Sequence, residues 1–146
     1  MQISGRWLLC DDGIVRPIMQ GAMLDHGGQW QGAEFLLDIG ADRTVFSAQI
    51  LSALQLRPVV SSNQLAGVGG RAESVEVETH VRLQCDDGGF AVFRGRYAAV
   101  TQLEALDMCV LGRDITNLFA VIVDRPHDVV CMLGQRHYYR IEEISS

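Results

Sequence analysis

Asp38 is the acidic residue whose sequence setting first suggests chemistry. It follows the apolar run Phe35–Leu37, which predicts a buried strand, and Gly40 after it permits a sharp turn of the backbone. This arrangement would present one carboxylate to a cleft at the end of a strand. Asp-x-Gly also occurs at residues 11–13 and 86–88, but those copies lie between strand-like runs and are typical of hairpin turns. Asp38 is therefore the candidate catalytic acid.

Three segments of the chain resemble motifs of the retropepsin-like (retroviral-type) aspartic protease family. Leu36–Asp42 resembles the catalytic loop, and Leu65–Gly70 resembles the glycine-rich tip of the flap. Val110–Asp114 is similar to the Gly-Arg-Asn/Asp bend that precedes the family's C-terminal helix. The motifs occur in the family's order, and the resemblance is strongest over residues 33–123. It implies a mostly β fold, with one retropepsin-like domain over residues 1–146, a closed β-barrel or sandwich, a flap hairpin and one or two short helices.

The resemblance also implies a mechanism and an assembly. Aspartic proteases use two carboxylates that share one proton, so that one acts as base toward a water and the other as acid toward the scissile carbonyl. A chain with one such loop must therefore form a homodimer, whose two-fold axis brings two copies of Asp38 together. The expected function is that of an aspartic endopeptidase acting on extended peptide or protein substrates, with no cofactor and no metal ion.

Further residues receive roles from the same resemblance. Gly40 and Ala41 would let the loops of two subunits approach closely, although an ordinary turn at a strand end is the alternative. Asp42 and Arg113 would form an ion pair within each subunit, whereas without the resemblance both would be interpreted as surface charges. A mobile flap tip would close over the substrate, the alternative being a plain loop. The flap positions are Ala66, Gly67, Val68, Gly69 and Gly70.

Ile39 departs from the family pattern, which has Thr or Ser between the catalytic Asp and Gly. In the family, that hydroxyl forms hydrogen bonds across the dimer axis and braces the two loops. An isoleucine can only pack there, at a typical net cost of about 1 kcal/mol for each lost hydrogen bond. Apolar contact between two Ile39 side chains would offset part of this cost. The alternative function is therefore a catalytically weakened or inactive module of the same fold that binds peptides or dimerises.

Hydrophobic patterning predicts the remaining elements. Residues 47–56 have apolar residues near helical spacing, with Ser47 as a possible N-cap and Pro58 marking the end of the helix. Residues 74–83 alternate between apolar and polar, which is typical of a half-exposed strand. Residues 107–119 indicate a strand, a glycine bend and a short helix. The other expected strands are 6–10, 14–19, 34–38, 90–93, 97–100, 120–123 and 129–133, and the chain continues through 22–24 to a turn at 25–29.

Composition excludes several function classes. The formal net charge of −6 argues against nucleic-acid binding, which needs clustered basic residues. All 12 basic residues are arginine, so lysine chemistry such as a Walker A loop or a Schiff base is excluded. The histidines lack metal-ligand spacing, and the separated cysteines favour buried thiols over disulfides or a zinc site. We recognise no signal peptide and no apolar run long enough to span a bilayer, so we expect a cytoplasmic protein without a membrane partner.

Overall fold

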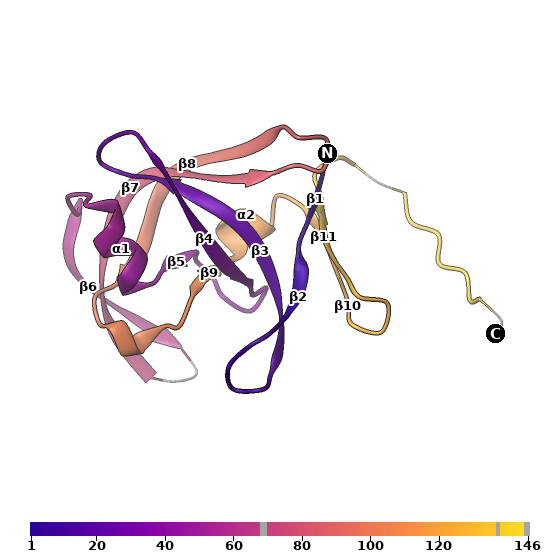
Figure 1. Cartoon of the computed structure of the whole chain (residues 1–146), viewed down its shortest axis with the longest axis horizontal. Coiled ribbons are helices and arrows are strands. Elements are labelled where there is room, and N and C mark those ends of the chain that lie inside the picture. Colours follow the sequence, from indigo (N-terminus) through magenta and orange to yellow (C-terminus); the bar gives the residue numbers. More distant parts are fainter. Residues whose placement is uncertain (68–69, 137, 145–146) are drawn as a thin grey trace.

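The computed structural model describes residues 1–67, 70–136 and 138–144. These residues are mostly β, with short helices between the strands (Figure 1). The strands are β1 Gln2–Ser4, β2 Arg6–Leu9, β3 Val15–Leu24, β4 Trp30–Leu37, β5 Val45–Phe46, β6 Val60–Gly67, β7 Gly70–Gln84, β8 Phe90–Val100, β9 Cys109–Leu111, β10 Ala120–Asp124 and β11 Val129–Leu133. The helical segments are α1 Ala48–Leu54, a 3₁₀ turn Leu103–Ala105 and α2 Arg113–Thr116.

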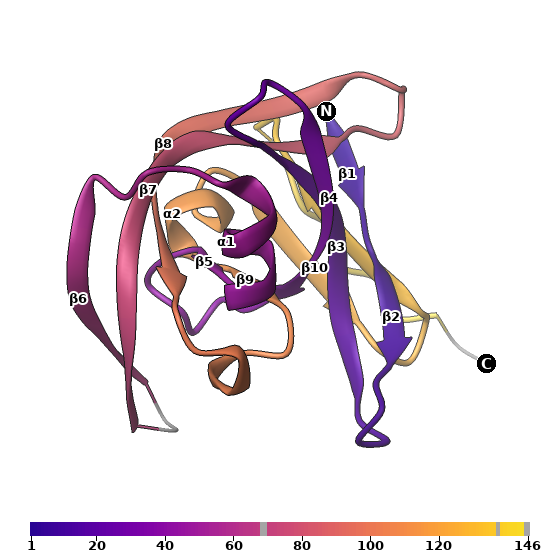
Figure 2. The ribbon, with the colours of Figure 1, turned by 60° about the vertical axis from the view of Figure 1, so that its left-hand side comes forward.

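The described strands form two sheets. The smaller sheet has the order β1-β11-β10, and the larger has the order β2-β3-β4-β9-β5-β8-β7-β6. Strand β3 also pairs with β7, so the larger sheet curls back on itself. Figure 2 shows the consequence: the β6–β7 hairpin and the β2–β3 hairpin descend on opposite sides, with α1 between them. Most of the fold therefore consists of hairpins arranged around one core.

The core lies inside the curled sheet. Phe35 and Phe46 are fully buried, and the ring of Phe46 stacks on that of Tyr97 at a centroid distance of 5.3 Å. Helix α1 covers this core with the buried Leu54. Its first turn is capped as predicted, because the Ser47 hydroxyl accepts a hydrogen bond from the backbone N–H of Ile50 at 3.3 Å.

Most of the predicted elements are confirmed. The strands around residues 11–13 pair as a hairpin, and so do the strands of residues 120–133. Two strand predictions were wrong: the strand expected at 14–19 continues to Leu24 as β3, and residues 90–93 and 97–100 belong to a single strand, β8. Its middle continues the ladder with β7, since Gly95 lies opposite Thr79. Helix α1 also ends earlier than Pro58 suggests, because Gln55 adopts a left-handed conformation with φ of 52°.

The cysteines are free thiols, and Cys85, Cys109 and Cys131 are buried while Cys10 is half-buried. This agrees with the interpretation of the cysteines as thiols in the core. Burial raises the pKa of the Cys109 and Cys131 thiols, which disfavours their reactive thiolate forms. Among the described residues, no helix is long and apolar enough to cross a membrane.

Candidate active site

Asp38 directly follows β4, which is a central strand of the larger sheet. Strand β4 pairs antiparallel with β3 on one side and parallel with β9 on the other, so its end is held from both sides. The backbone N–H of Asp38 donates to the carbonyl oxygen of Leu111, the last residue of β9, at 3.2 Å. The position of the carboxylate is thus determined by two strands that are distant in sequence.

A tight turn follows Asp38. The N–H of Ala41 donates to the carbonyl oxygen of Asp38 at 3.2 Å, and the N–H of Gly40 donates to its Oδ1 at 2.9 Å. This local contact fixes the half-buried carboxylate. Within the described part of the chain, Oδ2 has no hydrogen-bond donor. That oxygen is therefore available to a ligand, and we refer to residues 38–44 as the Asp38 loop.

Arg113, the first residue of α2, contacts the Asp38 loop at three points. Its backbone N–H donates to the carbonyl oxygen of Ala41 at 2.8 Å, and its Nη1 donates to that of Ile39 at 3.2 Å. Its Nη2 forms an ion pair with Asp42, as the family resemblance predicts. Both side chains of the pair are substantially exposed, so its contribution to stability is small and its effect is mainly to orient the loop.

Gly112 allows the Asp38 loop and α2 to approach each other closely. A Cβ atom at this position would lie 2.2 Å from the carbonyl carbon of Arg43 and 2.3 Å from its oxygen. Real Cβ atoms do not approach backbone atoms so closely, so any side chain here would push the two segments apart. The glycine in the bend is thus required by packing.

Thr44 and Asp114 form a second link between these segments, one that the sequence analysis missed. Oδ1 of Asp114 accepts from the backbone N–H of Thr44 at 2.9 Å and from its hydroxyl at 2.6 Å. The same hydroxyl accepts from the N–H of Gly112 at 3.1 Å. Asp114 is the last residue of the Val110–Asp114 motif, and this position was the one sequence feature that could have marked it as a site residue. Thr44 carried none, because a single threonine next to a strand has no distinctive pattern.

A cavity of about 440 Å³ opens beside Asp38, and we refer to it as the Asp38 cavity. Its lining residues come mainly from the Asp38 loop, the β6–β7 hairpin and the segment around the 3₁₀ turn, with one valine each from β5, β8 and β9. Four predicted site residues line it together, namely Asp38, Ala41, Ala66 and Gly70. Among the other predicted residues, Ile39, Gly40, Asp42 and Arg113 do not line it. Val68 and Gly69 lie outside the described residues.

The model of the aspartyl protease family matches residues 22–115. The chain belongs to this family. The match includes the Asp38 loop, both strands of the β6–β7 hairpin and the Gly112–Arg113 bend, so it confirms the family that the sequence motifs resemble. No curated protein sequence matches the chain significantly.

Two solved structures show the fold of this aspartyl protease family member. EIAV protease complexed with the inhibitor HBY-793 is 24% identical, with a TM-score of 0.51 over 70% of this chain and 86% of that one. A retropepsin-like aspartic protease from Rickettsia conorii is 13% identical, with a TM-score of 0.57 over 90% of this chain and 88% of that one. The chain therefore has a retropepsin-like, mostly β fold.

The β6–β7 hairpin of this family member lies over the Asp38 cavity. The two strands pair up to Gly67 and Gly70, next to the tip. Gly70 has φ of +111°, a conformation that residues with a side chain rarely adopt. Glycine at this position therefore has a backbone reason, and Leu65 and Arg71 on either side of the tip also line the cavity.

Ile39 is next to Asp38 in the sequence but does not line the Asp38 cavity. Its side chain is 59% exposed, although its carbonyl oxygen is held by Arg113. The mostly exposed isoleucine thus presents apolar surface to solvent. This is the position at which the family has a hydroxyl.

Proposed function

We propose that the chain is a homodimeric aspartic endopeptidase that hydrolyses extended peptide segments, with Asp38 of each subunit as the catalytic residue. The observation that carries this proposal is that Asp38 and the β6–β7 hairpin line one cavity in a member of the aspartyl protease family. The free Oδ2 of Asp38 supports it further. Residues 1–146 form a single domain in this proposal.

The proposed mechanism needs two carboxylates in contact. One Asp38 is ionised and takes a proton from a water, which attacks the scissile carbonyl. The other is protonated and donates a hydrogen bond to the carbonyl oxygen. Two like charges at short distance cannot both ionise cheaply, so the pair holds one proton and titrates as a unit. The hydrogen bond from Gly40 to Oδ1 keeps each carboxylate oriented for this task.

The proposed dimer is supported by the turn that carries Asp38. A two-fold axis near this turn would bring together two Asp38 carboxylates and two exposed Ile39 side chains. Burial of the isoleucines against each other would stabilise the dimer by the hydrophobic effect, at about 25 cal/mol for each Å² of apolar surface. The substrate would lie in the paired Asp38 cavities under both β6–β7 hairpins, held by backbone hydrogen bonds.

Asp38→Asn tests this proposal. We expect it to reduce cleavage of a mixed peptide library by about 10²–10⁴-fold, because the amide cannot exchange the proton. Asp87→Asn is a matched control. Asp87 Oδ1 also accepts from the N–H two residues later at 2.9 Å, but it lies in the β7–β8 turn, away from the Asp38 cavity. Cleavage that survives Asp38→Asn would refute the assignment of the catalytic residue.

A second candidate function is a non-catalytic module that binds peptides or dimerises. The specific observation in its favour is Ile39, which supplies no hydroxyl to brace the paired loops. The same experiment distinguishes the two functions. Peptides that bind the wild-type protein but remain uncut under all conditions tested favour the module, whereas cleavage that depends on Asp38 favours the enzyme.

A further inference from the structure

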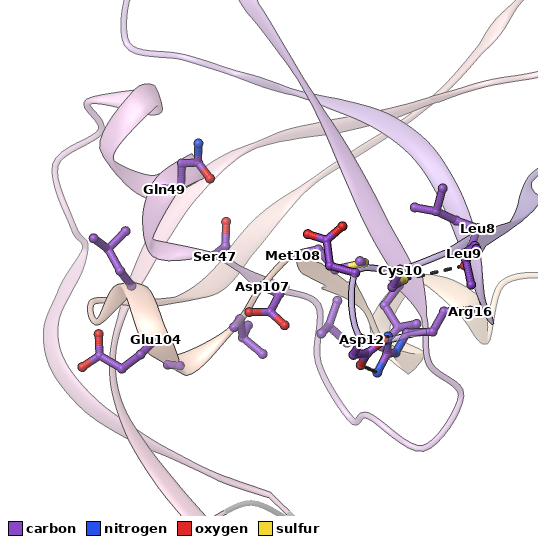
Figure 3. A pocket seen from close by; sticks show the side chains of 16 residues that line it. Leu8, Leu9, Cys10, Asp12, Arg16, Ser47, Gln49, Glu104, Asp107 and Met108 are labelled. Atoms are coloured by element: carbon purple, nitrogen blue, oxygen red, sulfur yellow. Dashed lines mark hydrogen bonds and ion pairs between the residues drawn. The ribbon is translucent and has the colours of Figure 1, made fainter. Parts of the chain in front are cut away.

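A second, larger cavity of about 940 Å³ adjoins the Asp38 cavity, and we refer to it as the side groove (Figure 3). It lies between the β2–β3 hairpin, the beginning of α1 and the 3₁₀ turn. Four residues line both cavities: Glu104, Ala105, Leu106 and Val110. The two cavities therefore share a wall, and a peptide bound beside Asp38 would have side chains within reach of the groove.

The lining of the side groove combines apolar side chains with carboxylates. Leu8, Leu36 and Met108 provide apolar surface. Asp11, Asp12, Glu104 and Asp107 provide carboxylates, and among the described residues Arg16 is the one cationic side chain in the lining. Figure 3 shows Asp107 between Glu104 on one side and the Asp12–Arg16 pair on the other. The groove is thus apolar with an acidic rim.

Arg16 does not neutralise the groove, because it is paired with Asp12. Its Nη1 donates to Oδ1 of Asp12 at 2.9 Å and its Nη2 donates to Oδ2 at 2.6 Å. These hydrogen bonds lower the pKa of Asp12 to about 2, so the carboxylate is ionised at neutral pH and the pair carries no net charge. Asp11 and Asp107 have no ion-pair partner in the part of the chain that the structure describes. Their charges remain uncompensated.

We propose that the side groove selects substrates with an arginine or lysine side chain close to the scissile bond. This inference rests on the proposed function and adds a substrate class to it. The long aliphatic stem of such a residue would pack on the apolar lining, while its cationic head would reach Asp11 and Asp107. A glutamate at the same position would be repelled by the same carboxylates. A symmetric dimer has two side grooves, so the preference applies on both sides of the scissile bond.

The test is a series of peptides that differ at one position near the cleaved bond. The position carries arginine, lysine, norleucine or glutamate, where norleucine provides an aliphatic stem without the charge. We expect kcat/KM for arginine to exceed that for glutamate by about tenfold, since two exposed ion pairs together supply a preference of this size. Norleucine should fall between them. The ratio should decrease at higher ionic strength, because both carboxylates are exposed to solvent.

The double variant Asp11→Asn with Asp107→Asn assigns the preference to the side groove. It should reduce the arginine-to-glutamate ratio to about one to three. Asp87→Asn should leave the ratio unchanged. A ratio that stays the same in the double variant, or a wild-type protein that cuts all four peptides equally, would overturn the inference while leaving the endopeptidase proposal intact.

Peptide binding to Asp38→Asn protein separates failure of the inference from failure of the proposed function. Fluorescence anisotropy with the same four peptides measures the preference of the groove without any cleavage. If the wild type cuts nothing but the arginine peptide binds about tenfold more tightly than the glutamate peptide, the proposed enzyme is wrong and the specificity of the groove is supported. Equal binding of all four peptides overturns the inference in that case too.

Discussion

The hydroxyl of Thr44 joins the Asp38 loop to the bend that contains Gly112 and Asp114. It donates to the carboxylate of Asp114 and accepts from the backbone N–H of Gly112, and the side chain is fully buried. Buried polar groups that lose a partner have a high desolvation cost, which exceeds the average value of a hydrogen bond. This one hydroxyl therefore contributes more to the shape of the Asp38 loop than the exposed Asp42–Arg113 pair.

Thr44→Val should lower the free energy of unfolding by about 2 kcal/mol. Valine keeps the shape of threonine but leaves the N–H of Gly112 without an acceptor and removes the shortest donor to Asp114. Urea unfolding followed by circular dichroism measures the change. Thr101→Val is the control, because Thr101 is exposed and makes no side-chain hydrogen bond in the described part of the chain. Equal unfolding midpoints for the two variants would contradict the role given to the Thr44 hydroxyl.

Single residues were predictable from sequence only where a motif marked them. The Asp42–Arg113 ion pair followed from a family pattern, and it is present. The Thr44–Asp114 contact joins residues 70 positions apart, and neither periodicity nor turn chemistry relates them. The same holds for Asp11 and Asp107, which were interpreted only as parts of a turn and of a strand region. Their common cavity exists only in the folded chain.

Strand β9 and the bend after it determine where the Asp38 loop lies. Strand β4 runs parallel to β9, with Leu37 opposite Leu111, and Gly112 then passes against the backbone of Arg43. Hairpins were predictable because their strands are consecutive and their turns have a sequence signature. The parallel pair was not, because it joins distant segments and leaves no local signal. The least predictable pairing thus positions the candidate catalytic residue.

Gly112→Ala should disrupt this contact. The added Cβ would overlap the carbonyl group of Arg43, so we expect the protein to lose about 3 kcal/mol of stability or more. Gly95→Ala is the matched control within β8, because a Cβ there meets no atom closer than 3.6 Å. Urea unfolding of both variants measures the difference, and near-ultraviolet circular dichroism reports whether Gly112→Ala folds at all. Equal free energies of unfolding for the two variants would contradict this prediction, because they would mean that the bend at Gly112 can move away from Arg43 without loss of stability.

At the scale of the whole molecule, the proposed mechanism needs more than one chain, since each chain supplies a single Asp38. The proposed dimer would supply the second Asp38. Ile39 is the exposed apolar residue that directly follows Asp38 in the sequence, so it would lie close to the two-fold axis. The family fold was predictable from three short motifs. The homodimer follows from the family resemblance alone and stays a prediction.

Ile39→Glu should weaken the proposed dimer. The two-fold axis would place two carboxylates together next to the Asp38 pair, and juxtaposed like charges raise a dissociation constant by about a hundredfold or more. Sedimentation velocity over a range of protein concentrations measures the shift from dimer to monomer. Val92→Glu is the control, because Val92 is also exposed, at 53%, but lies on β8. A wild-type protein that remains monomeric at every concentration would contradict the proposed assembly.

The Asp38 cavity and the side groove share lining residues, so a change in the shape of one cavity would affect the shape of the other. Leu106 and Val110 line both cavities, so a bulky group that displaced them in one cavity would change the space available in the other. Preferences for neighbouring substrate residues would then fail to add, as expected for groups that share a packed contact. The cutting pattern would consequently be described by favoured pairs of amino acids instead of by an independent choice at each position.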